Sequence, residues 1–498
     1  MHFALRVYIL ESRKFTSFIT ANRLRGRSGA QMNLEGFLQL LPSELGEYLV
    51  PATRALLLRR VSKTMLGVVD KLRCAVDVQP GGLVKRIYAG GSAAPEERRA
   101  AVRLFVARSL QLCLSDFRIR SFTLHGMVLE QTGSLNAMLR HSRWLEVLDL
   151  YNNHIDMDAI GEVFAAVPPS LRVLRLTRQW ITRAAVTPLC AALARLVVLA
   201  ELDLSENYLN SHGMEALTAS VASPHLARVS LRYNHLKSRF WNEHPRLGLD
   251  RFVLEKLDLS HNLLQAVVGD SIFACVRGSA AALVELDVSF NDMRVTGISY
   301  LGTALEHCRL LRHLNVAGNG CGDAALALLL SAVRPNTKGG AGIALESLDV
   351  SYNNLTAASA RQFSRCVSGS PALRRSLSRV SFSHNELRDT GGILVIEALL
   401  PCAMTSVGLA CCMLCEAAGL CLAGTMLHWP KLASLDVHGN CLFHTSLLLM
   451  ARALSENESE HKHMGFIGNW VLEDSNDEVL AILASARASR TVPARARA

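Results

Sequence analysis

The stretch LEKLDLSHNLL, residues 254–264, decides the fold of this 498-residue chain. Apolar side chains occupy its first, fourth, sixth and eleventh positions, and Asn262 occupies the ninth. The same frame returns in LEVLDLYNNHI at 145–155, LAELDLSENYL at 199–209 and LESLDVSYNNL at 345–355. Self-similarity at a period of about 20–50 residues is typical of a solenoid, in which stacked units bury one continuous core.

Thirteen copies of the frame can be placed in one register, and most steps between them are 26–29 residues long. Asn stands at the ninth position in ten copies, whereas Met127, Gln179 and Cys412 replace it in the other three. An Asn amide at this place can bond backbone groups that no strand ladder pairs. We therefore expect thirteen stacked units between residues 119 and 475. Their first positions are Ile119, Leu145, Leu171, Leu199, Leu226, Leu254, Leu283, Leu311, Leu345, Leu377, Met404, Leu432 and His461.

The long period favours one subtype of repeat. Each strand is followed by enough residues for a helix, and segments such as 158–167 and 182–196 carry apolar residues three and four apart. The chain resembles the ribonuclease-inhibitor-like class of leucine-rich repeat proteins. The resemblance implies an α/β solenoid, a horseshoe with parallel strands on the concave face and helices outside. It implies no particular partner, because the class holds inhibitors, GTPase activators, immune sensors and F-box receptors.

Residues 35–72 resemble an F-box. The matching residues are Leu41, Pro42, Leu45 and Leu49 and, after a leucine-rich helix, Val61. In that family such residues form a small helical module that buries an apolar face against a Skp-type adaptor, which a cullin then joins. The interval between Leu49 and Val61 is shorter than is usual there, and Met65 stands where the family often has Trp. The alternative is a helical cap on the first repeat. Either way we expect a small all-α N-terminal segment.

The other boundaries follow composition. Residues 1–31 form a basic extension predicted to be disordered, 32–75 the F-box-like helical segment, 76–118 a linker and capping helix, 119–475 the solenoid, and 476–498 the end of a capping helix with a basic disordered tail. The Arg-rich extension is also typical of a mitochondrial transit peptide, and translation from Met32 is a further alternative. We expect a cytoplasmic protein, or a mitochondrial one if 1–31 is a transit peptide.

The net charge of +10 lies mainly at the two ends. Residues 1–31 carry six basic residues against Glu11, and the last fifteen residues add four Arg, so +1 remains for the body. A nucleic-acid groove is therefore not indicated. We interpret the thirteen Cys as small buried side chains of a reducing compartment. The cluster Cys402, Cys411, Cys412, Cys415 and Cys421 lacks the paired CxxC spacing of zinc sites, so neither a metal nor another cofactor is expected.

The stretch from Val407 to Leu427 is apolar enough to suggest a membrane span, with Glu416 as its only charge. Because Val407, Leu409 and Leu414 stand in the repeat register, we predict a repeat unit there and no membrane partner.

No phosphate loop, HExxH, GxSxG or kinase signature is present, so we predict no catalytic residues. The expected function is non-catalytic protein–protein interaction, and the F-box resemblance implies the substrate receptor of an SCF-type ubiquitin ligase. A plain cytoskeletal or signalling scaffold is the alternative. A Ran-type GTPase activator is a distant one, because such proteins typically end in an acidic segment and this chain ends basic.

The third, fifth and seventh positions of each copy are predicted to face the concave side, since strand side chains alternate between faces. Asp recurs at the fifth position, and aromatic residues stand at the eighth, on the rim. This pattern predicts a partner-binding strip suited to a basic protein or peptide, with aromatic anchors. The alternatives are that the Asp row is the common form of the repeat, and that the aromatics pack under the insertions at 334–344 and 368–371. The strip consists of Asp258, Asp287, Asp349, Tyr233, Phe290 and Tyr352.

Overall fold

A computed structural model describes residues 119–126, 128–129, 132–209, 211–236, 248–265, 269–334, 342–459, 462–469 and 473–488, with short strands at 5–9, 24–25, 31–32 and 74–78. The chain divides into two compact units, Met1–Leu209 with Ala216–Leu226 and Asn210–Glu215 with Ala227–Ala498. The F-box-like residues Leu41, Pro42, Leu45, Leu49 and Val61 lie outside the described residues, so the adaptor-binding hypothesis and the boundaries near it stay predictions.

Each of the thirteen predicted copies carries one strand that includes its third to fifth positions. The first unit holds four of them: β5 (Ile119–His125), β7 (Val147–Tyr151), β9 (Val173–Arg175) and β10 (Glu201–Asp203). Within each unit, neighbouring strands are parallel and in register, so that Leu257 of β12 lies beside Leu286 of β13. The second unit holds nine: β11 (Arg228–Ser230), β12 (Lys256–Asp258), β13 (Glu285–Asp287), β14 (His313–Asn315), β15 (Ser347–Asp349), β16 (Arg379–Ser381), β17 (Ser406–Gly408), β18 (Ser434–Asp436) and β19 (His463–Gly465).

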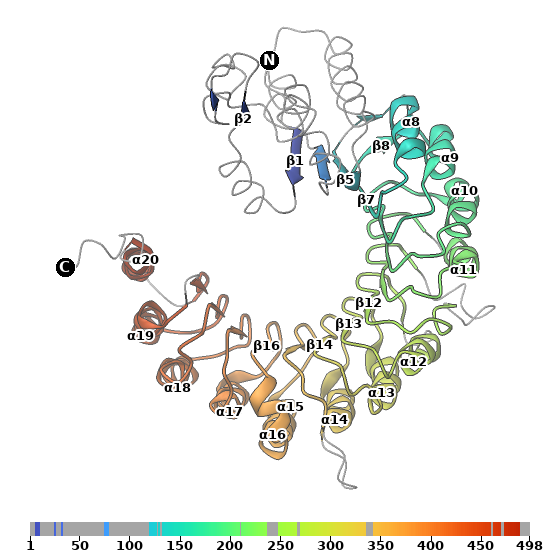
Figure 1. Cartoon of the computed structure of the whole chain (residues 1–498). Coiled ribbons are helices and arrows are strands. Elements are labelled where there is room, and N and C mark those ends of the chain that lie inside the picture. The colour runs from blue at the N-terminus through green and yellow to red at the C-terminus, as the bar shows by residue number, and fades with distance from the viewer. Residues whose placement is uncertain are drawn as a thin grey trace. The chain divides into compact units, whose positions relative to one another are not determined.

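Helices follow the strands, as their apolar spacing predicts. The first unit contains α8 (Gly133–His141), α9 (Met157–Ala166) and α10 (Arg183–Leu193), and α11 (Ser211–Ser220) has residues of both units. In the second unit the helices lie on the side of the strands away from the concave face (Figure 1). They are α12 (Gly269–Gly278), α13 (Arg294–Leu305), α14 (Gly322–Val333), α15 (Ala357–Gly369), α16 (Pro371–Ser376), α17 (Arg388–Leu399), α18 (Glu416–Met426), α19 (His444–Glu456) and α20 (Glu473–Ala488).

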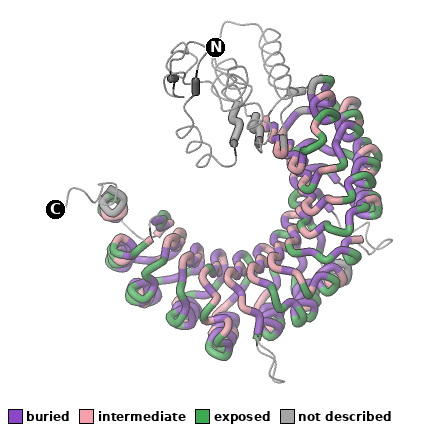
Figure 2. Tube along the Cα trace, in the orientation of Figure 1, coloured by how far each residue is buried: buried purple, intermediate pink, exposed green. Residues whose placement is uncertain are grey.

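The core of each unit lies between its strands and its helices, where the buried residues gather (Figure 2). The apolar positions of the repeat supply it: Leu254, Leu257, Leu259 and Leu264 are each at most 1% exposed. The α/β leucine-rich repeat solenoid predicted from the sequence is thereby confirmed.

The apolar stretch that resembles a membrane span is a repeat unit. It comprises β17, a turn and α18, with Val407, Leu409 and Leu414 buried in the core. Among the described residues, no helix is both long and apolar enough to cross a membrane.

Two further strands in the first unit lie outside the repeat register. β4 (Cys74–Val78) runs parallel to β5, and β1 (Leu5–Ile9) pairs with β4 in the antiparallel sense. Two short pairs complete the strands, β2 (Leu24–Arg25) with β3 (Gln31–Met32) and β6 (Val128–Leu129) with β8 (His154–Ile155). The sequence analysis placed no strand at 5–9 or 74–78, because it recognised strands by the repeat frame and these segments lack it. The open edge of a sheet can pair with any short extended segment.

Buried Asn side chains join consecutive repeats. The Asn291 amide donates to the carbonyl of Leu259 in the preceding repeat at 2.8 Å and to that of Val288 in its own repeat at 3.0 Å. Its Oδ1 accepts from the backbone N–H of Asn262 at 3.0 Å and of Leu264 at 3.3 Å. Asn262, Asn319, Asn353 and Asn440 repeat this pattern. Each amide therefore satisfies backbone groups of two repeats at once.

Two of the three substitutes at the ninth position lie among the described residues and keep part of this bonding. The Gln179 amide reaches the carbonyl of Leu150, and the Cys412 thiol lies 3.2 Å from the carbonyl of Phe382. Burial raises the pKa of Cys412 to about 12, so the group at this position is a neutral thiol. Sulfur is a weak hydrogen-bonding partner, so we expect Cys412 to stabilise the stacking less than an Asn amide would.

We predict that Asn291→Ala lowers the free energy of unfolding by roughly 2–4 kcal/mol, because buried backbone groups of two repeats lose their partner. The matched control is Asn354→Ala, which removes an exposed amide and costs about 1 kcal/mol through its left-handed backbone. Urea unfolding followed by circular dichroism measures both. Equal destabilisation by the two variants would show that the buried amide is not what joins the repeats.

Candidate binding surface

The backbone is left-handed at the eighth position of all thirteen repeats. Its φ ranges from 50° at Cys411 to 79° at Gly468, and most of these residues are not glycine. A side chain in this conformation costs on the order of 1–2 kcal/mol, so something in the fold must hold it there.

Hydrogen bonds between repeats hold this backbone. The N–H of His261 donates to the carbonyl of Ser289 in the next repeat at 2.8 Å, and that of Phe290 donates to Ala317 at 2.7 Å. The same bond joins Tyr352 to Ser383 at 2.9 Å and His384 to Ala410 at 2.7 Å. The eighth-position side chains from Tyr233 to Cys411 therefore point in the same direction along the second unit.

Aromatic and imidazole rings form a stacked row in the second unit. We call Tyr233, His261, Phe290, Tyr352 and His384 the ring row. Ring centres are 4.1 Å apart between Tyr233 and His261, 4.4 Å between His261 and Phe290, and 3.9 Å between Tyr352 and His384, with near-parallel planes. Stacked aromatic pairs are worth about 0.5–1.5 kcal/mol beyond their burial, which offsets part of the backbone cost.

Gly318 occupies the eighth position in the middle of the row and lets the row continue. A Cβ at Gly318 would lie 2.4 Å from Cδ1 of Phe290, so the Phe290 ring fills the space that a side chain would take. From there the ring reaches Tyr352, with centres 5.6 Å apart and planes tilted by 55°.

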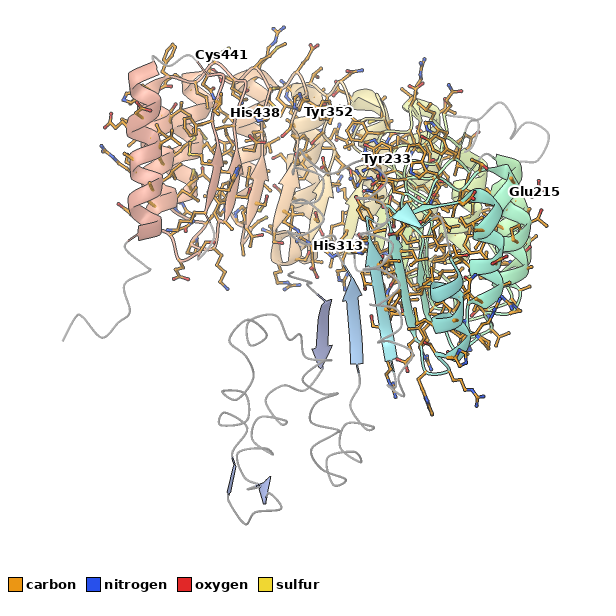
Figure 3. The ribbon with its side chains drawn as sticks, turned by 90° about the horizontal axis from the view of Figure 1, so that it is seen from above. Glu215, Tyr233, His313, Tyr352, His438 and Cys441 are labelled. Atoms are coloured by element: carbon orange, nitrogen blue, oxygen red, sulfur yellow. The ribbon has the colours of Figure 1, made fainter. Side chains whose placement is uncertain are left out.

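The three aromatic residues of the sequence-derived strip remain exposed. Tyr233 is 41% exposed, Phe290 37% and Tyr352 46%. Tyr233 and Tyr352 lie toward the edge at which the strands end, together with His438, whereas His313 lies toward the opposite edge (Figure 3). The described residues leave these rings exposed, and residues 335–341 of the longer insertion lie outside the described residues.

The three aspartates of the strip are half-buried and engaged in the turns that follow their strands. Oδ1 of Asp287 accepts from the backbone N–H of Ser289 at 2.9 Å and from its hydroxyl at 2.6 Å. Ser260 bonds Asp258 and Ser351 bonds Asp349 in the same way. Asp287 also accepts from the Asn315 amide at 2.9 Å, and its burial raises the pKa of the carboxyl. The Asp row therefore shapes the turns as well as carrying charge.

The seventh-position serine side chains do not face the concave side as the sequence analysis predicted. Ser260, Ser289 and Ser351 were expected to face the concave side, yet they are at most 5% exposed. Their hydroxyls turn back to the aspartates, because a short polar side chain next to a turn bonds local groups. The third position is half-buried or exposed, and its charges pair across strands, with Lys256 2.8 Å from Glu285.

The surroundings of both imidazoles of the row favour the neutral form. Burial, then Arg232, lowers the pKa of His261, and burial, then His438, lowers the pKa of His384. A neutral imidazole stacks on a phenyl or phenol ring without losing the hydration of a charge. The ring row is therefore a largely apolar surface beside half-buried carboxylates.

The sequence analysis missed the two imidazoles of the row, together with Cys411 and His438 beyond its C-terminal end. The signal was present, because His261, His384 and Cys411 stand at the same eighth position as Tyr233 and Phe290. One ligand atom each of His384, Cys411 and His438 lie within 4.8 Å of one another. The sequence interpretation of Cys411 as a buried hydrophobe is wrong, since its side chain is only half-buried.

No family model matches the chain. The human NACHT, LRR and PYD domains-containing protein 14 is 25% identical over 64% of this chain and 29% of its own length. The chain thus spans less than a third of that relative. The ribonuclease inhibitor of Sus scrofa is 24% identical over 66% of this chain and 72% of its own.

Among solved structures, the complex of Rad7 and Elc1 in yeast includes a chain that is 16% identical, covering 79% of this chain and 88% of that one, with a TM-score of 0.46. The repeats thus form an α/β leucine-rich repeat solenoid, and the chain is similar in sequence to a ribonuclease inhibitor and to a NACHT, LRR and PYD domains-containing protein.

Proposed function

We propose that this chain is a non-catalytic scaffold that binds a basic protein or peptide on the concave side of its second unit. The exposed ring row is the observation that carries the proposal. The two sequence relatives support the general idea of a protein-binding repeat chain. One is named for inhibiting another protein, and the other is named for containing leucine-rich repeats.

The chemistry of the row supports protein binding. Tyrosine is enriched among the residues that dominate binding energy at protein interfaces, because a rigid ring buries a large area at small entropic cost. Exposed aromatic side chains that follow one another over several repeats are also unusual on a surface that touches only water. Tyr233, Phe290 and Tyr352 provide contact points in successive parts of one unit.

The aspartates beside the row support a basic occupant. Asp258, Asp287 and Asp349 lie three positions before the rings on the same strand-and-turn segments, so an arginine or lysine stacked on a ring would lie near a carboxylate. Because Oδ1 of each aspartate already accepts turn hydrogen bonds, the rings rather than the acids are the side chains to test. Replacing the aspartates would disturb the turns and confuse loss of binding with loss of fold.

We predict that Tyr233→Ala/Tyr352→Ala weakens binding of the main partner by roughly tenfold or more, because two ring anchors are lost. The matched control is Tyr300→Ala, which removes a ring that is 44% exposed on α13. Quantitative capture from cells, followed by titration of the recovered protein against each variant, measures the effect. Equal affinity of the double variant and the wild type would exclude the ring row as the binding surface.

For the segment before the repeats, we propose the finer function of a substrate receptor of an SCF-type ubiquitin ligase. The support is the match of Leu41, Pro42, Leu45, Leu49 and Val61 to the F-box pattern. On this proposal the N-terminal segment holds a Skp-type adaptor and cullin while the ring row holds the substrate. A plain scaffold would use the same row without an adaptor.

We predict that the full chain captures a Skp-type adaptor and cullin, and that Leu41→Ala/Pro42→Ala abolishes this capture because it truncates the apolar contact. Gln39→Ala, in the same segment but outside the matching positions, serves as the control. Immunoprecipitation with quantification of both proteins provides the measurement. A wild-type chain that recovers neither protein is a plain scaffold.

A further inference from the structure

Three side chains at the C-terminal end of the ring row converge on one point. His384 and Cys411 stand at the eighth positions of the repeats that begin at Leu377 and Met404, and His438 stands at the seventh position of the next repeat. One ring nitrogen of each His and the Cys411 sulfur lie within 4.8 Å of one another, and all three residues are half-buried. We propose that these residues bind a zinc-class metal ion, with two imidazoles and one thiolate as ligands.

The ligand chemistry fits zinc. Zn²⁺ takes imidazole nitrogen and thiolate sulfur in tetrahedral sites, and sites with three protein ligands keep a fourth position for water or another molecule. Two imidazoles on one tetrahedral ion have ring centres roughly 5 Å apart when each metal–nitrogen bond is about 2.1 Å. The ring centres of His384 and His438 are 5.8 Å apart, with planes inclined at 63°. Small side-chain rotations would therefore bring both rings to one ion.

His438 is already oriented as a ligand. Its Nδ1 lies 2.7 Å from Oδ1 of Asp436, which leaves Nε2 as the nitrogen able to bind a metal. A carboxylate that accepts from the second nitrogen of a histidine fixes the ring and makes it a stronger ligand. In three other repeats of the second unit a serine hydroxyl makes the equivalent bond to its aspartate. His438 keeps that bond and adds a nitrogen that serine lacks.

Gly439 makes room for the sulfur. It occupies the eighth position of its repeat, and a Cβ there would lie 2.5 Å from Sγ of Cys411. Any larger residue would push the thiol away from the two histidines. The backbone N–H of Cys411 also donates to the carbonyl of His438 at 2.8 Å, which holds the two residues side by side.

An ion here would join three consecutive repeats at the end of the ring row. On binding, the Cys411 thiol loses its proton to solvent, its sulfur bonds the metal, and the neutral imidazoles replace bound waters. The fourth position would remain open beside the proposed protein-binding surface, where a carboxylate or imidazole of another molecule could take it.

The test uses the purified full chain, stripped of metal and titrated with Zn²⁺ against a competing indicator, and separately with Co²⁺. We expect one equivalent to bind, with a sulfur-to-cobalt charge-transfer band. Cys411→Ser should abolish that band, and both Cys411→Ser and His438→Ala should weaken Zn²⁺ binding at least tenfold. Asp436→Asn keeps the oxygen that caps the turn but removes the charge, and it should weaken binding about tenfold.

The control is Cys415→Ser/Cys441→Ser, which removes two neighbouring thiols outside the cluster and should bind like the wild type. Circular dichroism of each metal-free variant separates loss of a ligand from loss of fold. The proposal is overturned if the wild type binds no stoichiometric ion, or if Cys411→Ser keeps the cobalt–sulfur band. It is also overturned if the Cys415/Cys441 control loses binding instead. None of these outcomes bears on the ring row as a protein-binding surface.

Discussion

The stacking of this protein depends on the buried carboxamide at the ninth position of most repeats. A strand of three residues pairs few backbone groups with its neighbours, and the turn that follows it is buried, where unpaired groups are costly. The Asn291 amide meets this need with bonds to its own turn and to the preceding one. Because the same bonds recur from Asn207 to Asn440, consecutive turns within each unit are held in the same conformation.

Identical turns place the eighth position in a left-handed conformation in every repeat, and this decides where the exposed rings lie. In the second unit the backbone N–H of each such residue from Tyr233 to Gly439 bonds the next repeat, so the side chains at this position point in the same direction. Where these residues are Tyr, His and Phe, they stack, and the stacking offsets part of the backbone strain. The ring row is therefore a consequence of the buried amides as much as of the ring residues themselves.

The aspartates at the fifth position stabilise the turns and also contribute charge to the proposed binding surface. Asp258, Asp287 and Asp349 each use one oxygen to hold the turn that leads to the eighth position. At His438 the same aspartate bond orients an imidazole instead of a hydroxyl. A histidine in place of serine at the seventh position thus keeps the bond to the aspartate and supplies one of the three ligands of the proposed metal site.

The repeated frame of the sequence determined the solenoid, the thirteen strands, the buried Asn positions and the place of Tyr233, Phe290 and Tyr352 on the rim, because these depend on spacing within one repeat. It also determined that Val407 to Leu427 is a strand and a helix, since register outweighs hydropathy there. The repeated frame did not predict the strands at 5–9 and 74–78, because nothing in the spacing of their residues marks them.

Only the tertiary structure decided which residues of different repeats meet. His384, Cys411 and His438 are 27 residues apart at each step, which places them in successive repeats but does not show that their side chains converge. They come together because the interval between those repeats equals one turn of the solenoid, and because Gly439 leaves the space that the Cys411 sulfur occupies.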